Sequence, residues 1–227
     1  MTSSPNRAAP RLDRELVIRT ALRLLDDAGL DGLTLRRLAA ELDVQAPALY
    51  WHFASKQDLL DHMAHALTRP WMRDIRAASA GRPWEDWLTD AARAYRALLL
   101  SRRDGARLVA STRPLPDSLP LLDSCIAAFQ DSAGCVPGPA LQCLTTIIAF
   151  TRGFALDEEA ERHRAHGQPG AQARPGTSHA LEHAPQPVPH LAAAIADIGS
   201  PNGDSTFEYG LHLIITGIRA TMGHHRA

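Results

Sequence analysis

Apolar residues recur at intervals of three and four along almost the whole chain, and this spacing restricts the fold more than any other feature of the sequence. A repeat of this kind places the apolar side chains on one face of an α-helix. Alternation of apolar and polar residues, which is typical of a half-buried strand, is missing, and so is a βαβ rhythm. The sequence therefore predicts an all-α protein.

Signals for helix ends divide the first quarter of the chain into short helices. Gly29 can end a first helix, and Thr34 can cap a second one. Pro47 suits the first turn of a third helix, and Ser55 can cap a longer fourth helix. A helix, a short helix, a tight turn and another short helix within residues 12–53 form the helix-turn-helix plan, in which the second short helix enters the major groove of DNA.

Longer helices follow in the rest of the chain. Pro83 opens a helix with an aromatic stripe, in which we expect Trp84 to be a core residue, and Gly105 is expected to close this helix. Residues 165–189 are rich in Pro, Gly, Gln and His, so a mobile loop is expected there. The predicted organisation is a flexible arm at 1–10, a helix-turn-helix domain at 11–57, and a helical effector-binding and dimerisation domain at 58–227.

The charge balance neither supports nor excludes a nucleic-acid partner. The chain has 24 basic and 25 acidic residues, so contact with DNA requires a local basic patch. Three cysteines without a C-x-x-C spacing favour buried free thiols over disulfides or a zinc site, which fits a reducing cytosol. The first residues lack the apolar core of a signal peptide, and no window approaches the apolar length of a membrane span. We expect a cytoplasmic protein without membrane contact.

The segment from Gln45 to Phe53 holds three aromatic rings and an imidazole, more than a helix of this length can bury. Leu49 and Phe53 are four residues apart and can face inward as a pair. The other side chains must then point outward or sideways, which suits a surface that meets DNA. An aromatic-rich satellite core is the alternative interpretation.

The stretch GLTLRRLAAELDVQAPALYWHFASKQDLLDHMA resembles the DNA-binding domain of the TetR family of transcription factors, and its LYWHF core is similar to the tetracycline repressors within that family. Three later segments, RDGARLVASTRP, GFALDEE and FEYGLHLIITGIRA, resemble parts of the C-terminal domain in the same order. The resemblance implies a homodimer that binds palindromic double-stranded operator DNA and releases it when a small molecule enters the C-terminal domain. The last two long helices are expected to form the dimer interface, with small residues at Gly153, Gly210 and Gly217.

The same resemblance identifies candidate residues for DNA binding. The phosphate contacts fall on Thr34, Arg36, Tyr50, Trp51, His52 and Lys56, and the base contacts on Gln45, Ala46, Pro47 and Ala48. Gln45 alone can pair doubly with adenine, and Lys56 beside the Ser55 cap suits a phosphate. Arg36 and its neighbour Arg37 could also be solvated surface charges. Departures from the tetracycline repressors at Leu35, Asp43, Ala46 and Ala48 predict a different operator.

The effector cavity is implied among the helices after residue 80, at Ala91, Tyr95, Val109, Thr112, Arg113, Pro114, Cys125, Leu141, Leu144, Ala149 and Asp157. In relatives that bind a magnesium chelate, the position of Val109 holds a metal-binding histidine and that of Ala91 an amide. Neither chemistry is possible here, and Asp157 alone is a poor metal site. We therefore expect no metal and no cofactor. An aromatic or polycyclic effector is predicted, uncharged compounds being favoured over chelates, with Arg113 as its main polar anchor.

Two other classes of function are disfavoured. An enzyme would need a nucleophile with its base, a metal cluster or a phosphate loop, and none of the corresponding motifs occurs. A helical dimer without operator binding, acting as a ligand sink or adaptor, is the second alternative, and Tyr50, His52 and Lys56 argue against it. His163 and His166 lie near acidic residues and could hold a cation, but a charged loop edge explains them equally well.

Overall fold

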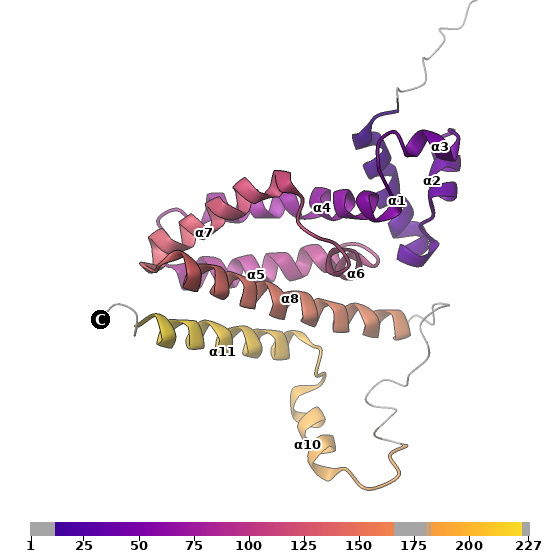
Figure 1. The fold of residues 1–227 in the computed structure, drawn as a ribbon. Coiled ribbons are helices and arrows are strands. Elements are labelled where there is room, and N and C mark those ends of the chain that lie inside the picture. Colours follow the sequence, from indigo (N-terminus) through magenta and orange to yellow (C-terminus); the bar gives the residue numbers. More distant parts are fainter. Residues whose placement is uncertain (1–11, 166–180, 182, 224–227) are drawn as a thin grey trace, which may run out of the picture.

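The computed structural model describes residues 12–165, 181 and 183–223, and all regular elements in these residues are helices. The predicted all-α class is thus confirmed for this part of the chain. Figure 1 shows a small N-terminal head at one end of a longer helical body. The head consists of α1 (Arg14–Gly32), α2 (Leu35–Glu41) and α3 (Ala46–Leu49).

Local caps determine where the helices of the head begin and end. The Thr34 hydroxyl accepts a hydrogen bond from the Arg37 amide (3.2 Å), as the sequence predicts for the start of α2. Gly29, with a φ of 72°, interrupts α1 shortly before its end. The third helix is shorter than expected, since α3 ends at Leu49, although the Phe53 amide still donates to the Leu49 carbonyl oxygen (3.0 Å). Leu49 and Phe53 are both buried, as predicted.

Helix α4 (Lys56–Ala78) runs from the head into the body (Figure 1). A reciprocal cap forms its first turn: Ser55 Oγ accepts from the Asp58 amide (3.1 Å), and the Asp58 carboxylate accepts from the Ala54 amide (2.8 Å). Further along, α4 packs against α1 of the head and, most extensively in the body, against α5 (Trp84–Leu100) and α7 (Leu119–Ala133). A movement of α4 would therefore displace the head.

The remaining elements of the body are α6 (Gly105–Ala110), the short 3-10 helix η1 (Pro116–Ser118), α8 (Pro137–Ala165), α10 (Pro189–Ile198) and α11 (Asp204–Gly223). The expectation for Gly105 is wrong, because α5 already ends at Leu100 and Gly105 begins α6. A Cβ atom at Gly105 would lie 2.4 Å from the Leu99 carbonyl oxygen. The start of α6 therefore packs so closely on the end of α5 that it requires glycine.

Helix α11 lies alongside α8 (Figure 1). A Cβ atom at Gly210 would lie 2.7 Å from the Phe150 ring of α8, whereas open space surrounds Gly153 and Gly217. Gly210 thus lets α11 approach α8 within one chain, and its expected place in a dimer interface stays a prediction. Gly153 and Gly217 remain available for a partner.

Two clusters of buried apolar side chains fill the molecule, and their boundary does not coincide with the end of the head. The first cluster contains Leu49 of the head together with Leu108 and Val109 of α6. The second joins α5, α7, α8 and α11 around Phe129 and Phe207. Because the head and α6 share a close-packed core, a shift of α6 would also displace the residues of the head that pack against it.

Residues 166–180 and 182, which make up most of the predicted mobile loop, lie outside the described residues. By length and composition α8 could cross a membrane, with 22% of its apolar window buried, which corrects the expectation that no segment approaches such a length. This helix packs against α5, α6, α7 and α11, and much of its remaining apolar surface is not covered within the chain.

Candidate functional site

The outer face of the head is formed by α3 and the turn that follows it. Tyr50 is 57% exposed and Trp51 is 89% exposed. Gln45 and Pro47 are also exposed, and Ala46, Ala48 and His52 are partly exposed. The satellite-core interpretation is therefore wrong for the two large aromatic side chains, which are available to a partner.

Cations without partners accompany this face. Arg36, Arg37 and Lys56 are exposed, and within the described part of the chain none of their side chains has an ion pair or a hydrogen bond. By contrast, Arg23 on α1 binds Glu41 (2.7 Å). Lys56 directly follows the cap of α4, where helix amides are open to an anion. Thr34 is exposed as well, and its hydroxyl oxygen caps α2.

Arg14 supports the turn that carries His52, and sequence reasoning missed it. Its guanidinium donates from Nε (3.2 Å) and Nη2 (2.7 Å) to the His52 carbonyl oxygen. The same group lies 5.2 Å from the centre of the Phe53 ring. No local motif connects residues 38 positions apart, so the contact becomes visible only in the fold.

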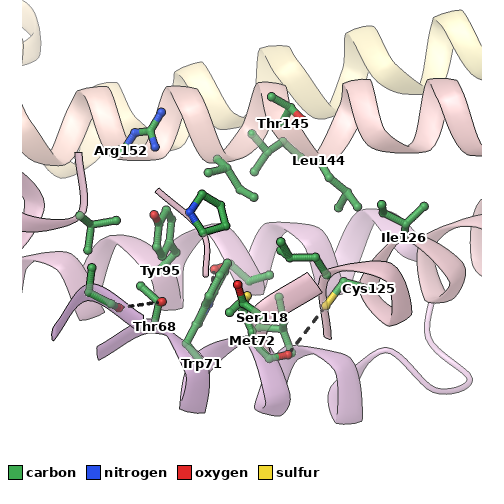
Figure 2. Close-up of a pocket in the computed structure, with 18 of the residues that line it drawn as sticks. Thr68, Trp71, Met72, Tyr95, Ser118, Cys125, Ile126, Leu144, Thr145 and Arg152 are labelled. Carbon is green, nitrogen blue, oxygen red and sulfur yellow. Dashed lines mark hydrogen bonds between the residues drawn. The ribbon is translucent and has the colours of Figure 1, made fainter. Parts of the chain in front are cut away.

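A cavity of about 310 Å³ lies in the body between α4, α5, α6, α7 and α8 (Figure 2). At one end the rings of Trp71 and Tyr95 stack with their centres 4.4 Å apart. Figure 2 places Cys125, Ile126 and Leu144 toward the other end. The polar or charged residues of the lining include His65, Thr68, Thr112, Arg113, Ser118, Thr145 and Arg152. A cavity of this size with an aromatic wall suits a small aromatic ligand.

Some polar groups of the lining have a hydrogen-bond partner within the chain, and others have none. The Trp71 indole N–H donates to the Ala91 carbonyl oxygen (3.1 Å). The buried Trp87 indole N–H has no hydrogen-bond partner among the described residues. Burial raises the pKa of the Tyr95 phenol, and the charge of Arg152 opposes this rise. Burial lowers the pKa of His65, so this side chain is neutral near pH 7.

Most of the residues expected at the effector site do line the cavity, namely Ala91, Tyr95, Val109, Thr112, Arg113, Pro114, Cys125, Leu141 and Leu144. Asp157 and Ala149 do not line it, and both are exposed on α8. Asp157 follows the lining residue Arg152 by five positions, which turns it about 140° away around the helix. The only carboxylate predicted for the site thus points elsewhere.

Sequence reasoning missed Arg152 and the contribution of α4, which supplies His65, Thr68, Trp71 and Met72 to the lining. The sequence predicts α4 only as a longer helix capped by Ser55, but the spacing of His65, Thr68 and Met72 places these residues on one helix face. A core helix has aliphatic residues on such a face, whereas α4 has polar and aromatic ones. This difference could have indicated the cavity. Trp84 is buried in the second core cluster, as expected.

A cluster that we call the Asp104 joint connects the head to α6. Asp104 is 3% exposed and has a left-handed backbone with a φ of 55°. Its carboxylate accepts hydrogen bonds from the Leu30 amide of the head (2.7 Å) and from Nη1 of Arg107 (3.1 Å). Arg107 in turn forms an ion pair with Asp31 of the head (3.1 Å). The N-terminal end of α6 is therefore bonded to the head at two places.

The joint extends to α8 through Glu159. This buried carboxylate accepts from the amides of Ala106 (3.3 Å) and Arg107 (3.1 Å), and burial raises its pKa. His163 lies 3.7 Å from Asp104 and so belongs to the joint. His166 lies outside the described residues. Among the residues that are described, no group of side chains that could hold a metal ion occurs. Because α6 also borders the cavity at Val109, the joint connects the cavity to the head.

Comparison with known proteins gives matches over nearly the whole chain. Residues 17–63 match the family described as "Bacterial regulatory proteins, tetR family", and residues 78–222 match "Tetracyclin repressor-like, C-terminal domain". The tetracycline repressor protein class A from transposon 1721 of Escherichia coli is 41% identical over 92% of this chain and 91% of its own length. The class C repressor of the same organism is 38% identical over the same shares.

Solved structures show the same similarity in three dimensions. A possible TetR family regulator from Streptomyces coelicolor A3(2) has a TM-score of 0.75 and 37% identity, covering 92% of this chain and 100% of that one. TetR (class A) in complex with 5a,6-anhydrotetracycline and magnesium has a TM-score of 0.63 and 32% identity, covering 91% and 98%. BioQ with its natural double-stranded DNA operator has a TM-score of 0.62 and 28% identity, covering 92% and 99%.

Proposed function

Since this chain belongs to the TetR family of bacterial regulatory proteins and is a ligand-responsive transcriptional repressor, we propose that it binds a palindromic operator as a homodimer and releases it when a small aromatic compound enters the cavity without a metal ion. The observation that carries this proposal is the position of α6. This helix borders the cavity at Val109 and is bonded to the head through Asp104. A compound that binds more tightly to the non-binding conformation would release the DNA.

In this proposal residues 11–57 form the DNA-binding domain and residues 58–227 the effector and dimerisation domain. The exposure of Gln45, Tyr50 and Trp51 and the unpaired charge of Lys56 support the assigned contacts. Gln45 reads a base edge, and Lys56 binds a phosphate. The named relatives are transcriptional regulators, so the proposed role is regulatory rather than catalytic, and we assign it to the cytoplasm.

Lys56→Ala and Gln45→Ala should affect operator binding in different ways. Loss of Lys56 removes one phosphate contact per half-site, so all DNA sequences should be bound more weakly and the salt dependence should become shallower by about 0.9 per lost contact. Loss of Gln45 should relax base preference at one position per half-site, by about 1–3 kcal/mol. Both effects are measured by selection from random DNA and by binding titrations at several salt concentrations.

The matched control for these variants is Arg73→Ala, which removes an exposed charge at the body end of α4. This variant should bind like the wild type. Unchanged binding by both head variants would contradict the assignment of α3 as the recognition helix.

The proposed dimer interface lies on α8 and α11. Tyr209 and Leu213 are 65% and 52% exposed on α11, and Gly217 follows four residues later with open space around it. These three residues are spaced by four, so they form one ridge along the helix. The open position of Gly153 gives α8 a surface that another helix backbone could approach closely. An obligate interface of this kind buries about 2,000 Å² or more.

A magnesium-borne effector does not fit the cavity. Magnesium prefers six oxygen ligands in nearly octahedral geometry. The lining holds no Asp or Glu, its one histidine is His65, and Val109 offers only methyl groups to a ligand. We therefore assign no metal to effector binding, in contrast to the relative whose structure contains anhydrotetracycline with magnesium.

The effector proposal is tested by operator release. Tetracycline with magnesium should not release the operator at nanomolar concentration, whereas members of a panel of metal-free polycyclic compounds should release it in the presence of a chelator. Ala91→Leu serves as a control, because Ala91 lines the cavity and a larger side chain fills it. This variant should bind DNA but respond weakly to the panel. Magnesium-dependent release at nanomolar tetracycline would overturn the metal-free assignment.

A further inference from the structure

The charges that line the cavity are all of one sign. Arg113 and Arg152 both contribute to the lining, and no acidic side chain does. Within the residues that the structure describes, neither arginine has an ion pair or a side-chain hydrogen bond. Arg113 is exposed, so water solvates its charge, whereas Arg152 is half-buried. An incompletely solvated cation beside apolar walls favours a ligand that brings a negative charge.

The carboxylates near Arg152 along α8 are occupied elsewhere. Glu158 binds Arg96 and Arg162, each at 2.7 Å. Glu159 accepts the amides at the start of α6, and Asp157 is exposed on another face. The charge of Arg152 is therefore left for the cavity.

The cavity also differs in polarity from one end to the other. Figure 2 shows Arg152 at the same end as Tyr95 and Thr68, away from Cys125 and Ile126. The positive charge of Arg152 acts to lower the pKa of the Tyr95 phenol, against the effect of burial. The Thr68 hydroxyl donates to the Ala64 carbonyl oxygen (2.9 Å), but the Tyr95 hydroxyl has no hydrogen-bond partner among the described residues. Arg152 and Tyr95 thus offer unused donors at one end.

We propose that the effector is an aromatic acid whose anionic group binds the Arg152 guanidinium and the Tyr95 hydroxyl, while its rings lie along the Trp71 side chain toward Ile126. The inference rests on the proposed function of this cavity as the effector site. It replaces Arg113 by Arg152 as the main polar anchor, because a half-buried charge is screened less by water than an exposed one. Trp71 and Tyr95 provide the stacking surface.

A matched pair of probes tests this inference. Anthracene carboxylic acid and anthracene methanol share one ring system and differ in charge, and quenching of tryptophan fluorescence reports the binding of either. The wild-type dimer should bind the acid at least about tenfold more tightly than the alcohol. Arg152→Leu should remove this preference, and Arg152→Lys should restore part of it.

Two controls separate the possible outcomes. Arg113→Leu should reduce the preference less than Arg152→Leu, and Arg164→Leu, on the same helix but outside the lining, should leave it unchanged. Operator binding without probe shows that each variant is folded. Equal binding of acid and alcohol, or a larger loss in Arg113→Leu, would overturn the inference while leaving the cavity as the effector site. If no aromatic compound of either kind binds or releases the operator, the proposed function itself fails.

Discussion

Leu213→Glu should leave the protein monomeric at micromolar concentration and abolish specific operator binding. In a two-fold symmetric interface the substitution occurs twice, and each buried carboxylate without a partner costs several kcal/mol. The dimer dissociation constant should therefore rise by about a thousandfold or more. Sedimentation velocity measures the mass, and a gel shift on the operator selected by the wild type measures DNA binding.

Leu119→Glu is the matched control for this variant. Leu119 is 55% exposed at the start of α7, and Leu213 is 52% exposed on α11. A glutamate at a helix N-terminus is favourable, so the control should remain a DNA-binding dimer. A stable dimer of Leu213→Glu, or a monomeric control, would place the interface on another surface.

Asp104→Ala should lower the free energy of unfolding by about 3 kcal/mol, because several interactions depend on this one carboxylate. The Leu30 amide and the Arg107 guanidinium both lose an acceptor. Alanine also adopts the left-handed backbone at position 104 less readily than aspartate. For a chain of this size the loss corresponds to a fall in melting temperature of about 6–12 °C at fixed protein concentration.

Two further variants identify the origin of that loss. Asn tolerates the left-handed backbone and keeps an acceptor, so Asp104→Asn should lose only about half as much as Asp104→Ala. Asp26→Ala removes an exposed ion pair with Arg102 across the same boundary, and should cost less than about 1 kcal/mol. Hydrogen exchange at the Leu30 amide should become faster in both Asp104 variants and stay unchanged in Asp26→Ala. Equal stability of all three variants would show that the Asp104 joint contributes nothing beyond surface charge.

Helices α4 and α6 both pack against the head and border the cavity, so the proposed effect of a ligand on the head has a physical basis. The first core cluster includes residues of the head, α4 and α6, and α4 also supplies the Trp71 wall of the cavity. A ligand that pushes α4 and α6 apart would therefore strain packing that the head shares. The proposed coupling needs no separate element, since α4 and α6 both border the cavity and pack against the head.

The helix-turn-helix head could be predicted from the sequence because its determinants are local. Thr34 and Ser55 cap the helices that follow them, and Leu49 and Phe53 are spaced so that one helical turn buries both. Exposure of Trp51 follows from the same spacing. Caps and i, i+4 pairs join residues that are close together in the chain, so the sequence alone is enough to predict the helix ends and the buried pair.

The cavity and the joint, by contrast, depend on residues far apart in the chain. Asp104 meets Leu30 across 74 positions, and Glu159 meets Ala106 across 53. Arg152 lies on the face of α8 that borders the cavity and Asp157 on another face, and the packing of α8 decides which face that is. The sequence alone determined the all-α class, the order of the two domains and the exposed aromatic face of the head. Only tertiary packing decided which helix faces line the cavity, because each contact there joins elements that lie far apart in the chain.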